Sequence, residues 1–139
     1  YQLALHGRFI RENLEIRYTH EGRLANNNHY LSNLLGLLLL GHALPDHPPA
    51  AGWWRWSRHR IQAEFNRQVY AEGSSFESSL PYHRLVMEMG VFATLLLLGR
   101  GVTPGRRFLR RLHRGLRLLG DAILPDGSLP LLEFSYRVP

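Results

Sequence analysis

The sequence predicts an all-α protein of antiparallel helical hairpins, forming a single domain over residues 1–139. Three observations predict this class. Apolar residues recur at helical spacing along most of the chain. Short segments rich in Pro, Gly and Ser separate the helical stretches, and short connections favour antiparallel neighbours. No segment before residue 128 alternates apolar and polar residues as a half-buried strand does.

The first helix is expected from Gln2 to Tyr18 and the second from His29 to Ala43. In the first helix, four apolar residues share one side and are expected to face the core: Leu3, Phe9, Ile10 and Leu14. The second helix carries leucine on nearly every face, which predicts that it is buried on most sides.

The third helix is expected from Ala51 to Tyr70. Its inner stripe is formed by apolar residues at helical spacing: Trp54, Ile61, Phe65 and Val69. The fourth helix follows Ser79, a favoured N-cap residue, and runs to about Gly99.

The fifth helix is expected to begin at Thr103–Pro104, as a cap followed by proline at the first position, and to end near Leu124. Its apolar stripe is expected to consist of leucines: Leu109, Leu112, Leu116 and Leu119.

An up-and-down arrangement has a geometric consequence for the loops. Loops 19–28, 71–80 and 125–135 should share one end of the bundle, and loops 44–51 and 100–103 the other end. The second and fourth helices both begin at the first end. Their free N–H groups and helix dipoles favour an anion there.

Polar side chains gather in the segments predicted to lie at this first end. They belong to "RLANNNHYLS" and "FESSLPYHR" and comprise Arg23, Asn26, Asn27, Asn28, His29, Glu77, Tyr82, His83 and Arg84. The asparagines are expected partly to cap the leucine-rich helix, with the remaining amides facing a polar cleft.

The composition restricts the class of partner. The formal net charge is +6, and every basic residue apart from histidine is arginine, whose planar fork pairs with carboxylate, sulfate or phosphate. The absence of cysteine excludes disulfides and cysteine metal sites, and the histidines show no metal-ligand spacing, so no metal is expected. The apolar runs are shorter than the ~20 residues of a membrane crossing, so no membrane partner is expected.

Three blocks occur in an order and spacing that resemble one family: "NNNHYLSNLLGLLLLG", "RQVYAEGSSFESSLPYHRLVMEMGVFATLLLL" and "LPDGSLP". Over about residues 3 to 130 the chain resembles the heparinase II/III-like polysaccharide lyases. The resemblance implies part of an incomplete α/α toroid, which in the family is followed by β-sandwich domains. It implies β-elimination of uronic-acid-containing polysaccharides such as glycosaminoglycans, without a cofactor, in a periplasmic or secreted enzyme.

The resemblance also implies residue roles. Asn28 would bind and neutralise the uronate carboxylate, Tyr82 would transfer protons, and His29 would support them. Substrate-binding roles would fall to neighbouring polar residues: Arg23, Asn27, Glu77, His83 and Arg84. The chemistry fits these residue types, because an amide donor stabilises the enolate-like charge that develops on the carboxylate. A tyrosine phenol, with a pKa of about 10, needs nearby positive charge to act as a base.

The chain departs from the family pattern after "DGSLP", where it reads "LLEFSYRVP" and ends. The β-sandwich is missing from this chain, and with it a catalytic histidine of the family. We therefore expect the chain to be a piece of a larger toroid that needs the remainder of the lyase to complete an active site.

Plainer interpretations remain open at the same residues. Asn28 could be an N-cap, Tyr82 a core aromatic, and His29, His83 and Arg84 ordinary solvated or supporting groups. Trp53, Trp54 and Trp56 are expected to pack at the opposite end of the bundle. The segment "RRFLRRLHRGLR" (106–117) is either a solvated face or a non-catalytic binding surface for polyanions. Nucleic acid is disfavoured there, because Phe108 is its one aromatic residue for base stacking.

Overall fold

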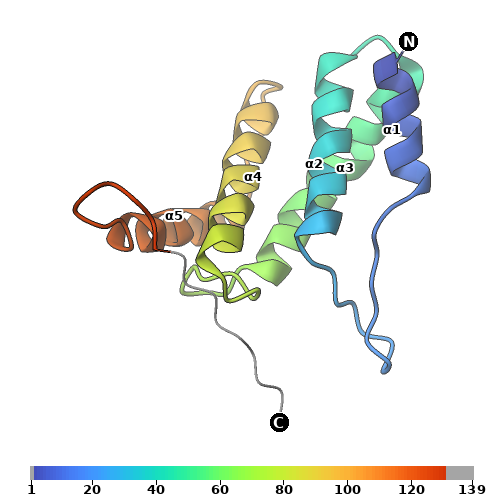
Figure 1. The fold of residues 1–139 in the computed structure, drawn as a ribbon. Coiled ribbons are helices and arrows are strands. Elements are labelled where there is room, and N and C mark those ends of the chain that lie inside the picture. The colour runs from blue at the N-terminus through green and yellow to red at the C-terminus, as the bar shows by residue number, and fades with distance from the viewer. Residues whose placement is uncertain (1, 131–139) are drawn as a thin grey trace.

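The computed structural model of the protein describes residues 2–130. Within this range the chain forms five helices and no strand (Figure 1). The helices are α1 (Gln2–Glu12), α2 (Asn28–Ala43), α3 (Pro48–Gln68), α4 (Leu80–Leu98) and α5 (Arg106–Asp121). Isolated antiparallel bridges pair Tyr18 with Leu24 and Val69 with Ser75. The predicted all-α class is confirmed.

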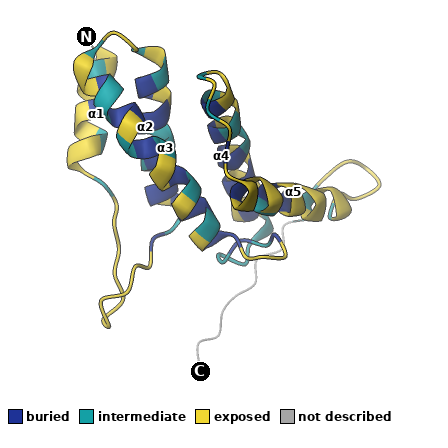
Figure 2. Cartoon of the chain, turned by 180° about the vertical axis from the view of Figure 1, so that it is seen from behind, coloured by how far each residue is buried: buried dark blue, intermediate teal, exposed yellow. Residues whose placement is uncertain are grey.

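Helices α1 to α4 run alternately down and up, as expected of helical hairpins (Figure 1). Helix α2 contacts α1, α3 and α4, which explains why leucine occupies most of its faces. Helix α5 departs from the up-and-down pattern, because it lies across the lower part of α4 in both views (Figures 1 and 2). It packs against α3 and α4.

The core lies between α2, α3 and α4, each of which carries buried residues (Figure 2). Leu31, Leu34 and Leu38 of α2 belong to one cluster with Ile61 and Phe65 of α3. Trp54 and Val69 belong to the same cluster, so all four residues expected to form the inner stripe are confirmed as buried, although Val69 lies just beyond the end of α3. The Phe65 ring also meets Phe108 of α5 edge-on, with centroids 4.8 Å apart.

Helix α1 is shorter than the periodicity predicts, since it ends at Glu12 and not at Tyr18. The amide of Asn13 donates to the carbonyl of Phe9 over 2.8 Å and so closes the last turn. Beyond it, side chains from elsewhere take up the backbone N–H groups: Glu15 N–H donates to Asn33 Oδ1 at 2.8 Å. Tertiary hydrogen bonds therefore replace the helical ones.

Two predicted apolar stripes are also partly wrong. Leu3 and Phe9 of α1 are 51% and 66% exposed, and only the Ile10 and Leu14 part of that stripe packs against the core clusters. In α5, Leu109 and Leu116 are exposed. The stripe that α5 actually buries is Phe108, Leu112 and Gly115.

Other helix ends also differ from the prediction, including the end of α5, which lies at Asp121 and not near Leu124. Helix α3 begins at Pro48, before Ala51, because proline is tolerated in the first turn. It stops at Gln68, since Val69 is extended and pairs with Ser75. Helix α5 has Gly105 as its N-cap, so Thr103 does not cap it.

The tryptophans lie at the N-terminal end of α3, as expected. Trp53 and Trp54 are buried. The guanidinium groups of Arg11 and Arg60 each lie over the Trp56 ring, 4.4 Å from its centroid. These contacts account for the tryptophans by packing.

Candidate functional site

Two of the three loops predicted to share one end of the bundle do meet. Asn28 begins α2, and Glu77 precedes the start of α4 by three residues. The Glu77 carboxylate accepts one hydrogen bond from the Asn28 backbone N–H at 3.0 Å and another from Asn28 Nδ2 at 3.1 Å. The third loop was predicted at residues 125–135. Residues 125–130 follow α5, and residues 131–135 lie outside the described residues.

The N-cap of α2 is Asn27, not Asn28. The Asn27 side chain accepts a hydrogen bond from the backbone N–H of His29 at 3.1 Å. Asn28 is therefore not needed as a cap, and the capping interpretation for this residue is wrong. The Asn28 amide nitrogen carries two hydrogens, of which Glu77 accepts one.

A buried polar network that sequence reasoning missed holds the asparagine segment from behind. Glu64 and Gln68 of α3 are 2% and 1% exposed. Gln68 Nε2 donates to the Asn27 carbonyl at 2.8 Å and to Glu64 Oε1 at 2.9 Å. Asn26 Nδ2 donates to Glu64 Oε2 at 3.3 Å, and Arg67 also donates to this oxygen.

One sequence feature could have indicated this network, namely where Glu64 and Gln68 lie along α3. They are spaced i, i+4 on the face of α3 that also carries Ile61 and Phe65. Polar residues on a buried face must be hydrogen-bonded, so the spacing could have indicated partners in a neighbouring loop. The burial of Tyr30 and the nearby Glu64 charge raise the pKa of the Tyr30 phenol.

Tyr82 lies in the first turn of α4 and is 47% exposed. The interpretation of Tyr82 as a core aromatic is therefore wrong. Its side chain stands at the helix start that Glu77 links to Asn28. The positive end of the α4 dipole lies at this same turn.

Three of the basic side chains expected at this site have an acidic partner. His29 Nδ1 is 2.9 Å from Glu15 Oε2, and Arg84 Nε donates to Glu88 Oε1 at 2.8 Å. Arg23 pairs with Glu21 at 3.4 Å, with both side chains well exposed. The N-termini of α2 and α4 add the positive ends of their dipoles to this site, and the Glu77 carboxylate lies at the N-terminus of α2.

His83 is buried, with 3% exposure. Its Nε2 lies 3.1 Å from the Gly115 carbonyl, which can only accept, so Nε2 carries the proton. Burial lowers the pKa of this imidazole, and the bond to Gly115 opposes the shift only in part. His83 therefore links α4 to α5 through this buried hydrogen bond and does not face solvent.

The model of the family described as Heparinase II/III N-terminus matches residues 2–138. The chain belongs to this family. The match spans both loops at the candidate site and all five helices. A search among curated proteins finds no match.

Solved heparinase III structures share the fold of this heparinase II/III family member. One heparinase III crystal structure superposes with a TM-score of 0.75 at 18% identity, covering 93% of this chain and 19% of that one. The heparinase III BT4657 gene product gives a TM-score of 0.71 at 20% identity, covering 91% and 19%. The same product with methylated lysines gives 0.70 at 20% identity. The chain thus spans about a fifth of the length of these structures.

The fold is accordingly that of a helical fragment of a larger heparinase-like architecture. In the described part of the chain, no helix is both apolar enough and long enough to traverse a lipid bilayer.

Proposed function

We propose that this chain is the helical portion of a polysaccharide lyase that cleaves uronic-acid-containing polysaccharides by β-elimination. Asn28 binds the uronate carboxylate, and Tyr82 transfers the proton. Family membership supports the reaction class. The single structural observation that carries the residue assignment is the Glu77 carboxylate, which ties Asn28 to the segment leading into the Tyr82 helix.

In the proposed reaction, a base removes the proton on C5 of the uronate. The electron pair of that C–H bond forms the C4–C5 double bond, and the C4–O bond breaks with its electrons on the leaving oxygen. Negative charge develops on the uronate carboxylate during proton removal. The second N–H of the Asn28 amide is the donor assigned to that charge.

Tyr82 is assigned as the base, with its phenolate stabilised by the N-terminus of α4. The same hydroxyl then protonates the leaving oxygen where both groups lie on one face of the sugar, so no proton is left unaccounted for. His29, Asn27, Arg23 and Arg84 are assigned as supporting groups around the substrate. Glu77 orients Asn28.

The remainder of the site is assigned to the rest of the lyase, because the chain covers about a fifth of the matched structures. A periplasmic or secreted location follows for an enzyme whose substrate is an extracellular acidic polymer.

The test uses the full-length protein with a panel of acidic polysaccharides and follows the ultraviolet absorbance of the unsaturated uronate. We expect product with at least one polymer. Tyr82→Phe is expected to lower kcat by about 10²-fold or more, the ordinary contribution of a general acid–base group. Tyr18→Phe removes a hydroxyl from another exposed tyrosine and serves as the control.

Two results would contradict the proposal. If no uronate polymer gives product, the lyase assignment is wrong. If Tyr82→Phe retains full activity, the family assignment stands and the role of Tyr82 is wrong. Binding of polyanions without any product, unchanged by Asn28→Ala, would favour the non-catalytic binding module.

A further inference from the structure

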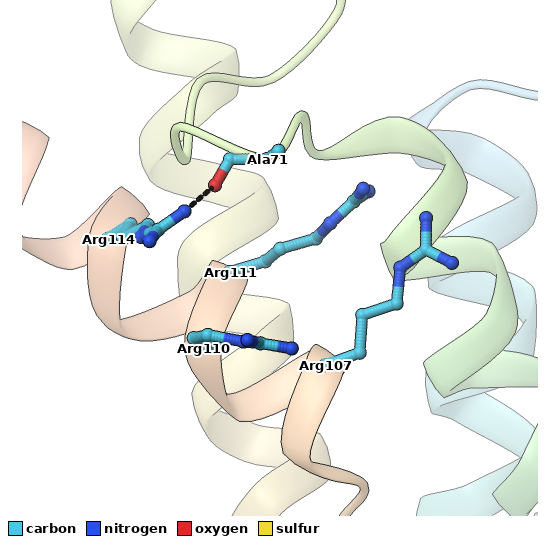
Figure 3. A pocket seen from close by; sticks show the side chains of 5 residues that line it. All are labelled: Ala71, Arg107, Arg110, Arg111 and Arg114. Atoms are coloured by element: carbon cyan, nitrogen blue, oxygen red, sulfur yellow. Dashed lines mark hydrogen bonds between the residues drawn. The ribbon is translucent and has the colours of Figure 1, made fainter.

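Four arginines surround one pocket where α5 meets the segment after α3. The pocket has a volume of about 280 Å³ and is lined by Ala71, Arg107, Arg110, Arg111 and Arg114 (Figure 3). All four arginines come from α5, and Ala71 comes from the segment that leads from α3 to α4. This pocket therefore brings together a concentration of positive charge that the candidate site lacks.

Two of these arginines are fixed by backbone carbonyls. Arg111 donates to the carbonyls of Asn66 and Val69, and Arg114 Nη1 donates to the Ala71 carbonyl at 2.6 Å (Figure 3). Carbonyls at the end of a helix lack helical partners, and these guanidinium groups satisfy them. The two side chains are thus held in place at the pocket wall.

The other two arginines, Arg107 and Arg110, are exposed. In the part of the chain that the structure describes, neither has an acidic partner or a side-chain hydrogen bond. Burial and the charge of Arg107 lower the pKa of Arg111. Among the described residues, the acidic charge that raises the pKa of Arg111 in return is that of Glu72. Positive charge at this pocket therefore exceeds its local compensation.

The pocket and the candidate site share a segment. Ala71 lies near the start of the segment that Glu77 joins to Asn28. Gly73 of this segment lies directly on α5, since a Cβ there would meet Arg114 and Gly115 backbone atoms at 2.6 Å. The segment that carries Ala71 and Gly73 thus connects the arginine pocket to the contact between Glu77 and Asn28.

We propose that the arginine pocket is a subsite for an oxyanion group of the acidic polysaccharide, either a sulfo group or a second carboxylate. Arg107 and Arg110 contact the oxyanion, while Arg111 and Arg114 fix the pocket wall. A guanidinium fork matches two oxygens of such a group, and charge-assisted pairs of this kind are the stronger hydrogen bonds. The inference rests on the proposed function only for the identity of the polymer.

The test is titration calorimetry of the full-length protein with matched tetrasaccharides of one uronate backbone, sulfated and unsulfated. The variant is Arg107→Gln with Arg110→Gln. Its control is Arg106→Gln with Arg117→Gln, which removes the same charge from exposed positions on the same helix outside this pocket. We expect the pocket variant to bind about 10-fold more weakly or worse, which corresponds to about 1.4 kcal/mol, and the control to change by less than about 2-fold.

The two tetrasaccharides separate the possible ligands. Weakening confined to the sulfated one supports a sulfo group, and equal weakening of both supports a carboxylate. Equal losses in variant and control would show a diffuse field of the helix and overturn the subsite, as would no loss in either. Absence of elimination product with tight binding intact would overturn the proposed lyase reaction but not the subsite.

Discussion

Replacing Glu77 with alanine tests the contact on which the candidate site depends. The substitution removes the acceptor of two hydrogen bonds from Asn28, at 3.0 Å and 3.1 Å. It also removes a negative charge from the N-terminus of α2, where the helix dipole favours one. Both losses fall at the junction of two loops that are far apart in the sequence.

The expected magnitude follows from these contacts. Hydrogen bonds to a charged group contribute about 1.5–3 kcal/mol each when buried. Glu77 is half-buried, so the lower limit applies, and the charge at the helix N-terminus adds about 0.3–1 kcal/mol. Allowing for partial replacement by water, we expect Glu77→Ala to lower the free energy of unfolding by about 2–3 kcal/mol. Glu77→Gln keeps one acceptor and should lose about 1 kcal/mol.

Urea-induced unfolding followed by tryptophan fluorescence measures this change, because all three tryptophans lie in α3. Glu72→Ala is the control, because this exposed glutamate accepts a hydrogen bond from Ser74 of its own segment and does not join that segment to α2 in the described structure. A loss below about 0.5 kcal/mol for Glu77→Ala would refute the reasoning, since it would equal an ordinary surface substitution. In the full-length enzyme, Glu77→Ala should also lower kcat/KM while Glu72→Ala leaves kcat unchanged.

Three further outcomes are expected. Tyr82→Phe should leave the free energy of unfolding within about 0.5 kcal/mol of wild type while it lowers kcat for elimination by about 10²-fold or more, which unfolding and absorbance assays compare directly. Gly41→Ala should lower the free energy of unfolding by about 1–3 kcal/mol, because the new Cβ would lie 2.7 Å from the Trp54 backbone nitrogen. In the same urea assay, Gly52→Ala should raise the free energy of unfolding by about 0.5–1 kcal/mol, because its Cβ would meet nothing within 4 Å. The pKa of His83 is lowered in the folded state, so the unfolded state binds the proton more readily. The free energy of unfolding should therefore fall as the pH drops below about 6.5. His83→Gln should flatten that part of the curve of unfolding free energy against pH.

The helix count and most of the core followed from periodicity. The leucines of α2 and the Ile61 and Phe65 stripe of α3 could be predicted because an apolar surface of that width must be buried. The α1 boundary could not, because Asn13 and the loop hydrogen bonds that end the helix involve partners distant in sequence. The exposure of Leu109 and Leu116 was likewise unpredictable, since it depends on α5 crossing α4.

The candidate site, too, could be predicted from the sequence only in part. Resemblance to the family indicated Asn28 and Tyr82, and the up-and-down topology predicted that their helices begin at one end. Sequence reasoning placed Glu77 near them but did not find that it accepts both Asn28 donors. It missed Glu64 and Gln68 entirely, because a buried polar pair has meaning only once its loop partners are known.

By itself, the sequence determined the all-α class, the hairpin order and the family, because each depends on the local pattern of apolar, polar and turn residues. The tertiary structure alone decided which charges are compensated. His29, Arg23 and Arg84 have acidic partners, whereas Arg107 and Arg110 line a pocket and form no ion pair with any residue that the structure describes. The reason is physical: whether a charge is available to a ligand depends on the groups that folding brings within a few ångströms of it, and composition does not record that distance.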